Sequence, residues 1–210
     1  MQRGLFLDLD GTLADSLPFM RQIYQQFLDG FGCHGSDEEF ESLNGPPLPQ
    51  LVAQLRQAHG LESPVESLIL TYRSLLDEHY MSVPAAPGAA ALLRAANERS
   101  WTAAVVTSSS APRAERWLER RGLKGYIAAI VGGEDEMRGK PDPAPYRLAL
   151  QRCGCSAAGS LAVEDSRAGA TAAVSAGLAT YVLAESPDDP SGWPEVAGFV
   201  ARLDLLISEL

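Results

Sequence analysis

The sequence has few of the features that mark secreted, membrane-spanning or nucleic-acid-binding proteins. Among its 210 residues are three cysteines, Cys33, Cys153 and Cys155, an odd number without the spacing of a metal-binding finger. No apolar run has the length of a signal peptide or a membrane span. We therefore expect reduced cysteines, no membrane partner and a cytoplasmic location.

Positive charge is also scarce. The chain has 17 Lys and Arg residues against 27 Asp and Glu residues, which gives a formal net charge of −10 at pH 7. Because recognition of nucleic acids depends on Lys and Arg, this balance argues against a nucleic-acid partner. An anionic substrate would need positive charge placed locally, and a bound divalent cation could supply it.

A short apolar run near the N-terminus ends in two carboxylates. Leu5–Leu7 is typical of a parallel strand buried on both faces, and Asp8, Asp10 and Gly11 follow it. Ligands of open α/β sheets bind beyond the carboxyl ends of the strands, so Asp8 and Asp10 are candidate catalytic residues. The alternative is a strand that ends in an ordinary Asp-Gly turn. No G-x-G-x-x-G follows this strand, which argues against a dinucleotide-binding protein.

Strand-like and helix-like segments alternate through the second half of the chain. The predicted strands are Leu5–Leu7, Thr102–Thr107, Tyr126–Val131, Leu161–Val163 and Thr180–Leu183, and a closing helix is expected from Phe199 to Leu210. This alternation is typical of an α/β fold with a doubly wound, Rossmann-like parallel sheet.

The first two predicted strands are far apart in the sequence. Residues 8–101 separate them, whereas a crossover connection needs only about a dozen residues. We expect residues 16–84 to form an inserted helical cap domain, and residues 1–15 and 85–210 to form the core domain. Because the insertion begins directly after the two aspartates, the cap would lie over the site as a lid.

Further polar residues fall at the ends of the other predicted strands or in the loops after them. They are Thr107, Lys140, Glu164 and Asp165. In this fold these positions can converge on one crevice with Asp8 and Asp10. Mg²⁺ prefers carboxylate oxygens, a lysine can neutralise a phosphate, and aspartate is a nucleophile in phosphoryl transfer. The pattern therefore predicts a magnesium-dependent phosphoryl-transfer site.

Four motifs give the chain a resemblance to the haloacid dehalogenase (HAD) superfamily, and within it to the capped phosphatases. The motifs are Asp8-Leu9-Asp10-Gly11-Thr12, Val105-Val106-Thr107, Gly139-Lys140-Pro141 and Glu164-Asp165-Ser166. They occur in the family's order, and the resemblance covers essentially the whole chain. It implies a Mg²⁺-dependent phosphatase that hydrolyses a small phosphorylated metabolite, of the phosphoglycolate or sugar phosphate type, through an aspartyl-phosphate.

The resemblance also implies catalytic roles for the motif residues. Asp8 would be the nucleophile, Asp10 the general acid and base, and Lys140 the partner of both Asp8 and the phosphoryl group. The residues expected to bind the transferring phosphoryl group are Thr107, Ser108 through its backbone, Lys140 and Gly11.

The metal ligands implied by the resemblance come from the first and the fourth of these motifs. Asp8, the Asp10 carbonyl and Asp165 would hold Mg²⁺, with Glu164 as a further ligand or a supporting group. The dehalogenases and phosphonatases of the superfamily lack an aspartate at the position of Asp10, so its presence favours a phosphatase.

Two other functions use similar residues. A phosphomutase resembling β-phosphoglucomutase shares the four motifs, but that mutase has a basic residue in its specificity loop, where this chain has Asn44-Gly45-Pro46-Pro47. A non-catalytic phosphoacceptor of the receiver type also uses an aspartate, Mg²⁺, a hydroxyl and a lysine, but it has no room for an inserted cap. Hydrolysis is therefore the favoured reaction.

Three further polar residues lie near the motifs. Ser109 either contacts the substrate or caps the helix that follows it. Glu134 and Asp135, which precede the lysine motif, are interpreted as solvated loop acids.

Overall fold

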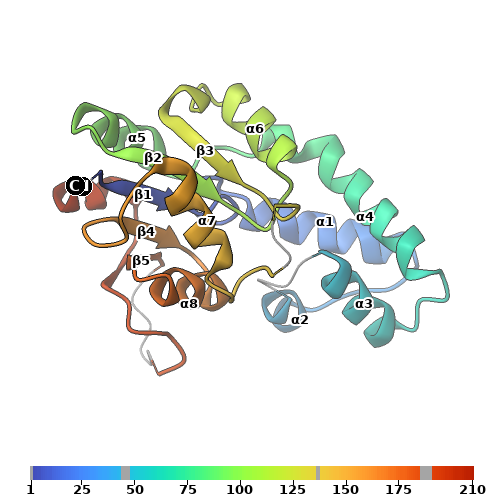
Figure 1. Cartoon of the computed structure of the whole chain (residues 1–210). Helices are drawn as coiled ribbons and strands as arrows, with labels where there is room; N and C mark the ends of the chain where they lie inside the picture. The colour runs from blue at the N-terminus through green and yellow to red at the C-terminus, as the bar shows by residue number, and fades with distance from the viewer. Residues whose placement is uncertain (1, 44–47, 136–137, 185–190) are drawn as a thin grey trace. The chain divides into compact units, whose positions relative to one another are not determined.

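The computed structural model describes residues 2–43, 48–135, 138–184 and 191–210, and the chain divides into two compact units (Figure 1). One unit contains Met1–Asp15 and Pro84–Leu210, and the other contains Ser16–Val83. The chain therefore leaves the first unit after Asp15 and returns to it at Pro84. Each unit has a buried hydrophobic core.

The first unit is built on a parallel sheet of six strands. The strands are β1 (Gly4–Leu7), β2 (Thr102–Val106), β3 (Ile127–Val131), β4 (Leu161–Glu164), β5 (Ala179–Leu183) and β6 (Gly198–Val200). Their order is β3-β2-β1-β4-β5-β6, so β1 lies in the middle and pairs with β2 and β4. The predicted doubly wound parallel sheet is confirmed.

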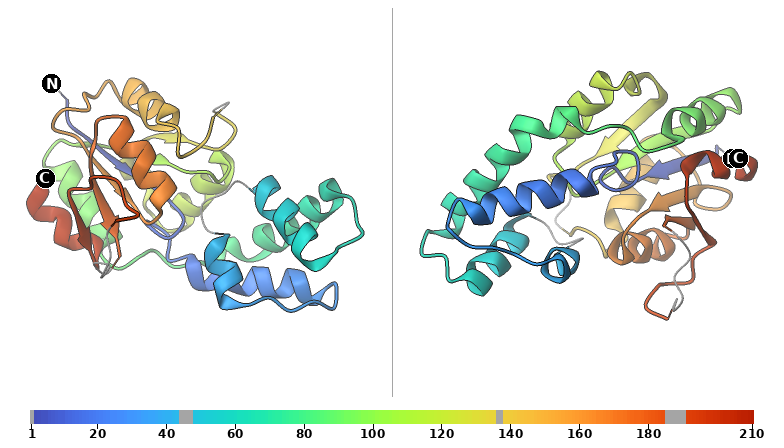
Figure 2. Two further views of the ribbon diagram at one scale, coloured as in Figure 1. Left: turned by 90° about the horizontal axis from the view of Figure 1, so that it is seen from below. Right: turned by 180° about the vertical axis from the view of Figure 1, so that it is seen from behind.

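Helices cover both faces of this sheet (Figure 2). They are α5 (Ala89–Glu98), α6 (Ala111–Arg120), α7 (Ala144–Cys153) and α8 (Arg167–Ser175), with 3₁₀ turns η2 (Lys124–Tyr126) and η3 (Leu203–Glu209). Helix α7 packs on β1, β2 and β3, and α8 packs on β4 and β5. Helix α5 packs on β2 and on η3.

The central strands are apolar because both of their faces are covered. Strand β1 reads Gly-Leu-Phe-Leu and is buried along its whole length, as expected for a strand inside an α/β sheet. Phe6, Ala104 and Ala162 lie on three neighbouring strands and share one core cluster with residues of α7 and α8. The small alanines of α8 let this helix lie close to the sheet.

The prediction of five strands missed the edge of the sheet. Gly198–Val200 forms β6, so Phe199 lies in a strand and not in a closing helix, and Leu203–Glu209 is a 3₁₀ helix. A strand of three residues is too short to show the alternation of apolar and polar side chains. Phe199 also continues the helix-like spacing of the apolar residues in the 3₁₀ helix that follows, which made the whole segment resemble a helix. Helix α5, whose sequence Ala-Ala-Ala-Leu-Leu-Arg-Ala-Ala-Asn-Glu favours a helix, was also not predicted.

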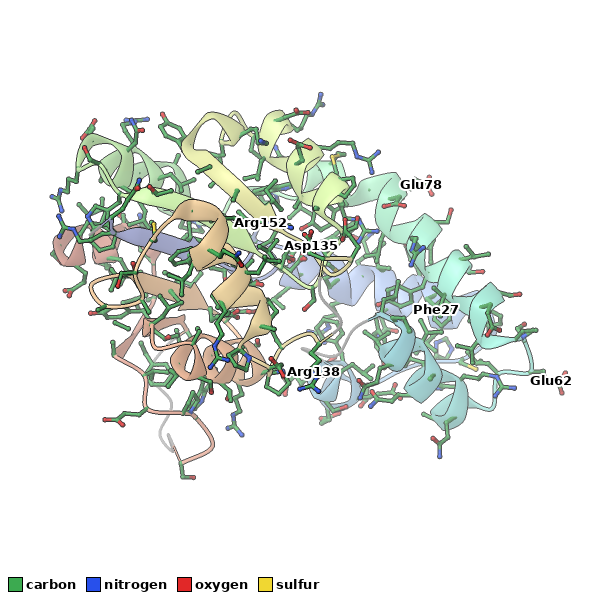
Figure 3. The ribbon with its side chains drawn as sticks, in the orientation of Figure 1. Phe27, Glu62, Glu78, Asp135, Arg138 and Arg152 are labelled. Atoms are coloured by element: carbon green, nitrogen blue, oxygen red, sulfur yellow. The ribbon has the colours of Figure 1, made fainter. Side chains whose placement is uncertain are left out.

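The second unit is a helical bundle. Its elements are α1 (Leu17–Asp29), α2 (Asp37–Ser42), α3 (Leu48–His59), α4 (Val65–His79) and the 3₁₀ turn η1 (Tyr80–Ser82). Helix α4 packs against α1 and α3. Phe27 lies in the core of the bundle, whereas Glu62 and Glu78 lie at its periphery (Figure 3). Within the described ranges, no helix combines the length and the apolar character needed to cross a membrane.

Helix α2 has no fully buried side chain, and polar contacts add to the packing of its Phe40 against the core of this unit. The Glu39 carboxylate accepts a hydrogen bond from the Tyr24 hydroxyl of α1 and lies 2.9 Å from Nε2 of His59, the last residue of α3. The Ser36 hydroxyl caps the helix by accepting the Glu39 N–H at 3.1 Å. Glu39 therefore joins α2 to two other helices.

We expect Glu39→Ala to lower the free energy of unfolding by about 1–3 kcal/mol, because the buried Tyr24 hydroxyl and His59 lose their shared acceptor. Glu41→Ala removes an exposed carboxylate from the same helix and should change stability by less than about 0.5 kcal/mol. Urea denaturation followed by circular dichroism measures both. Equal effects of the two substitutions would contradict the assigned role of Glu39.

Candidate active site

The site is built where three neighbouring strands end. Asp8 follows β1, Thr107 follows β2, and Glu164 is the last residue of β4. Backbone hydrogen bonds extend the sheet by one residue, because Asp8 N donates to Val163 O at 3.0 Å and Thr107 N donates to Val131 O at 2.9 Å. The strand order also reverses at β1, because β2 and β3 follow on one side of it and β4, β5 and β6 follow on the other. Open α/β sheets bind ligands at this position.

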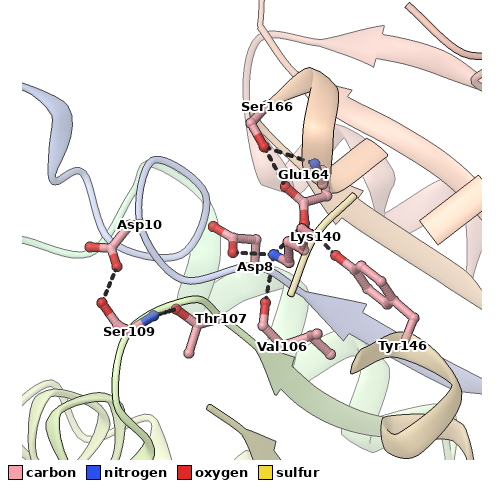
Figure 4. A network of polar contacts seen from close by, with 10 residues as sticks. Asp8, Asp10, Val106, Thr107, Ser109, Lys140, Tyr146, Glu164 and Ser166 are labelled. Carbon is pink, nitrogen blue, oxygen red and sulfur yellow. Dashed lines mark hydrogen bonds and ion pairs between the residues drawn. The ribbon is translucent and has the colours of Figure 1, made fainter. Parts of the chain in front are cut away.

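Lys140, from the loop before α7, joins two of these strand ends (Figure 4). Its Nζ donates to Asp8 Oδ1 at 2.6 Å, to Glu164 Oε1 at 2.5 Å and to the Val106 carbonyl at 2.9 Å. These three acceptors match the three N–H bonds of an ammonium group. The side chains of Lys140, Asp8 and Glu164 are only 6%, 9% and 0% exposed, so the charges interact with little screening by water.

Glu164 is held by further groups from two helices. The Tyr146 hydroxyl, from α7, donates to Glu164 Oε1 at 2.5 Å. The Ser166 hydroxyl lies 3.4 Å from Oε2 and also accepts the Gly169 N–H as the cap of α8. A Cβ atom at Gly169 would lie 2.0 Å from Oε2, so a glycine is needed for α8 to pass this close to the carboxylate.

Three carboxylates at this edge of the sheet form a candidate metal site. Asp8, Glu164 and Asp165 each offer an oxygen within 4.8 Å of the others, and Lys140 supplies one positive charge against these three groups. The second carboxylate oxygen of Asp8 points away from Lys140 (Figure 4). Oxygen donors with an excess of negative charge suit a hard divalent cation such as Mg²⁺. Among the described residues, this group does not include the Asp10 carboxylate.

The electrostatics of the site reflect this excess of negative charge. Burial raises the pKa of Asp8 well above its ordinary value; Glu164 and Asp165 add to this effect, and Lys140 opposes it. Burial and the neighbouring Glu164 raise the pKa of Asp165 to about 7. Burial would lower the pKa of Lys140, but Asp8 and Glu164 outweigh it and hold this pKa above its ordinary value. The lysine is therefore a permanent cation between carboxylates that are costly to ionise without a further positive charge.

The loop after β1 turns sharply at Gly11. Its φ is +81°, a conformation that favours glycine, and a Cβ atom here would lie 2.0 Å from Asp165 Oδ2. The Gly11 N–H donates to the Ala14 carbonyl at 3.0 Å, which closes the turn. Gly11 thus lets the loop that carries Asp10 pass close to Asp165.

Asp10 and Thr107 are linked through Ser109. The Ser109 hydroxyl donates to Asp10 Oδ2 at 2.8 Å, and the Ser109 N–H donates to Thr107 Oγ1 at 3.0 Å (Figure 4). The structure therefore brings the predicted residues into two neighbouring groups at the same strand ends. The first contains Asp8, Lys140, Glu164 and Asp165, and the second contains Asp10 and Thr107.

Two polar partners in these groups were not predicted. Tyr146 was not among the predicted site residues, and Ser109 was not linked to Asp10. A tyrosine on an otherwise aliphatic face is a usable signal, because a buried hydroxyl needs a partner. The side chain of Ser108 is exposed. The predicted specificity loop, Asn44–Pro47, lies outside the described residues.

Glu134 and Asp135 are exposed loop acids, as predicted, but each also has hydrogen-bond partners that the sequence did not indicate. The Glu134 carboxylate accepts the Ala111 N–H at 2.9 and 3.1 Å, which caps the start of α6. Asp135 Oδ1 lies 2.6 Å from Arg152 Nη2, and Asp135 Oδ2 accepts the Gly132 N–H at 2.8 Å. Both acids fix the loop after β3, because each accepts a backbone N–H at a chain turn.

Comparison with known proteins places this site in a family. A model of haloacid dehalogenase-like hydrolases matches residues 5–183, a range that contains all four motifs. The chain belongs to this family. It is 32% identical over 192 residues to a phosphoglycolate phosphatase of Rhodospirillum rubrum, with 87% of this chain and 80% of the relative covered. It is 30% identical over 190 residues to hexitol phosphatase A of Escherichia coli, with 90% and 86% covered.

Solved structures show the same fold. CbbY of Rhodobacter sphaeroides superposes with a TM-score of 0.83 at 22% identity, covering 98% of this chain and 96% of that one. A HAD hydrolase of Entamoeba histolytica has a TM-score of 0.83 at 19% identity, covering 99% and 100%. The predicted resemblance to HAD-like phosphatases is therefore confirmed by the family model and the two relatives, and the solved structures confirm the fold.

In this HAD-like hydrolase, Gly169→Ala should lower the free energy of unfolding by about 1–3 kcal/mol, because the new methyl group collides with the fixed Glu164 carboxylate. Gly125→Ala is the matched control, since no atom lies within 4 Å of its added Cβ. It should change stability by less than about 0.5 kcal/mol. Chemical denaturation of both variants tests this, and a Gly169→Ala protein as stable as the control would refute the close packing.

Asp165→Asn should stabilise the metal-free hydrolase at high pH. The pKa of Asp165 is about 7 in the folded protein, and an aspartate in the unfolded chain titrates near about 4. The folded state therefore holds the proton more tightly, and stability falls as the pH rises between these values. At pH 8 in EDTA the variant should gain about 1–3 kcal/mol, because asparagine stays neutral.

The same comparison at pH 4 provides the control for this prediction. There Asp165 is protonated in the folded protein and resembles asparagine in charge, so the native protein and the variant should differ little. Denaturant midpoints at both pH values measure the difference. A variant that is less stable than the native protein at pH 8 would contradict the assigned burial cost.

Proposed function

We propose that the protein is a Mg²⁺-dependent phosphatase that hydrolyses a small phosphorylated metabolite through an aspartyl-phosphate on Asp8. The observation that supports this most directly is the buried contact of 2.6 Å between Lys140 Nζ and Asp8 Oδ1, beside a three-carboxylate group. The curated relatives named above are phosphatases. In this proposal Ser16–Val83 is the family's cap and selects among phosphate esters.

Asp8 is the nucleophile in the first step. One of its carboxylate oxygens forms a bond to phosphorus while the bond between phosphorus and the leaving oxygen breaks. Lys140 holds the carboxylate in place and balances the negative charge of the incoming phosphoryl group. The product is an aspartyl-phosphate and a free alcohol.

Asp10 transfers the protons in both steps. It first donates a proton to the leaving oxygen and then, as a carboxylate, accepts a proton from the water that attacks phosphorus. This second attack breaks the bond between phosphorus and Asp8, and it releases inorganic phosphate. Asp10 ends the cycle protonated, ready for the next substrate.

The hydroxyl of Thr107 and the backbone N–H of Ser108 are assigned to the phosphoryl group in this proposal, whereas Gly11, whose own N–H donates to the Ala14 carbonyl, shapes the turn after Asp10. Because Thr107 Oγ1 accepts the N–H of Ser109, its own proton remains free to point toward an oxygen of the substrate. Backbone N–H groups after β2, at the start of a helix, suit an anion.

Mg²⁺ would be held by Asp8, Asp165 and the Asp10 carbonyl, with Glu164 in support. When bound, it neutralises charge on the transferring phosphoryl group. The supporting role of Glu164 fits its contacts, since its Oε1 already accepts hydrogen bonds from Lys140 and Tyr146.

Phosphate release from a panel of phosphate compounds tests the proposal. The panel contains the esters phosphoglycolate and several sugar phosphates, together with the anhydride inorganic pyrophosphate, each assayed with Mg²⁺ and with EDTA. Turnover should need Mg²⁺, and Asp8→Asn should lower kcat at least about a thousandfold, because it removes the nucleophile. Asp204→Asn is the control, since this aspartate pairs with Arg202 outside the site.

Two outcomes would count against a phosphatase. A folded, Mg²⁺-binding protein that releases phosphate from no ester would contradict the proposal. Transfer of phosphate to a sugar without its release to water would instead identify a phosphomutase.

A further inference from the structure

Ser109 contacts two residues of the proposed site at once. It lies between the end of β2 and the start of α6. Its hydroxyl donates to Asp10 Oδ2 at 2.8 Å, and its backbone N–H donates to Thr107 Oγ1 at 3.0 Å (Figure 4). Ser109 therefore connects the loop after β1 to the loop after β2.

The backbone of Ser109 is fixed by the loop after β3. Its carbonyl accepts the Gly133 N–H at 2.9 Å. A Cβ atom at Gly133 would lie 2.5 Å from the Ser108 carbonyl oxygen, and one at Gly132 would lie 2.5 Å from Ala111 N. The two glycines thus let the loop pack directly against the segment that carries Ser109, and side chains there would push it away.

This loop is in turn anchored to a helix. Asp135 accepts the Gly132 N–H and pairs with Arg152 of α7, which also donates to the Ile130 carbonyl at 2.8 Å. The two side chains lie side by side in Figure 3. The backbone of Ser109 is therefore tied by hydrogen bonds through this loop to α7, and a group that orients another side chain needs such support.

The hydroxyl of Ser109 is not used to cap α6. The N-cap residue of this helix is Ser110, whose side chain makes no capping hydrogen bond, and the Ala111 N–H is accepted by Glu134. Of the two roles considered for Ser109, capping is thus excluded by the geometry. The contact with Asp10 is the feature that needs an explanation.

We propose that Ser109 is a positioning residue that holds Asp10 in the orientation for proton transfer to the leaving oxygen. This inference rests on the proposed phosphatase function. A general acid works only within hydrogen-bond reach of its target, and Asp10 is half-buried on a turn. A hydroxyl can donate to a carboxylate and accept from a carboxylic acid, so it can hold Asp10 before and after the proton moves.

If Ser109 positions Asp10, its effect on the rate should depend on the leaving group, whereas a purely structural role of Ser109 would affect all substrates alike. A leaving group of low basicity needs little help from a general acid, whereas an alkoxide needs a proton as it departs. Loss of the Ser109 hydroxyl should therefore slow the cleavage of alkyl phosphates far more than that of p-nitrophenyl phosphate. The effect belongs to the first chemical step, which kcat/KM reports.

The test compares native protein with Ser109→Ala, Ser109→Thr and Ser110→Ala on p-nitrophenyl phosphate, phenyl phosphate and an alkyl phosphate, all with Mg²⁺. Ser109→Ala should lose about tenfold in kcat/KM on the alkyl ester and less than about twofold on p-nitrophenyl phosphate. Ser109→Thr keeps the hydroxyl and should recover most of this loss. Ser110→Ala should match the native protein, and thermal melting should show that all variants are folded.

The outcomes separate the inference from the function on which it rests. An equal loss on all three esters, or a loss that Ser109→Thr does not reverse, would overturn the positioning role. A rise in KM on every ester with kcat unchanged would overturn it in favour of a direct substrate contact. No Mg²⁺-dependent turnover by the native protein would overturn the phosphatase proposal, and this inference with it.

Discussion

The site depends on one buried cation held between two carboxylates. Lys140 donates to Asp8 and to Glu164 where little water is present, so each of these charges would be costly without the others. The lysine belongs to the loop before α7, and its partners are Asp8, which follows β1, and Glu164, which ends β4. A single ammonium group thereby fixes the geometry of three segments that the chain connects only through long crossovers.

The sheet provides the frame for this contact. Asp8 and Lys140 are 132 positions apart, yet the parallel order of the strands brings their segments to one edge. Glycines make the edge compact, since a side chain at Gly11 would collide with Asp165 and one at Gly169 with Glu164. The cost of confining three carboxylates in this space is visible in the raised pKa values of Asp8 and Asp165. A divalent cation would relieve that cost, which is the physical reason that the group suits a metal.

The parts that could be predicted from sequence are those with local signals. Asp8 and Glu164 follow apolar strands, and the topology of an open α/β sheet is enough to bring such positions together. The role of Glu134 and Asp135 could not be predicted, because it depends on which backbone N–H groups the fold places beside them. Strand β6 is three residues long, and it is recognisable as a strand only from its pairing with β5 in the folded protein. Side-chain partners across long separations need the assembled structure.

The two aspartates of the proposed site have different partners because their roles place different requirements on their protonation states. A nucleophile must be ionised and must point at phosphorus, and Lys140 favours the ionised form of Asp8 and fixes the direction of its carboxylate. An acid that must also become a base cannot depend on a contact that suits only one protonation state, because a neighbouring cation favours the ionised form alone. The neutral hydroxyl of Ser109 suits both forms of Asp10, since it can donate or accept. The contrast between a lysine beside Asp8 and a serine beside Asp10 thus follows from the different proton requirements of the two aspartates.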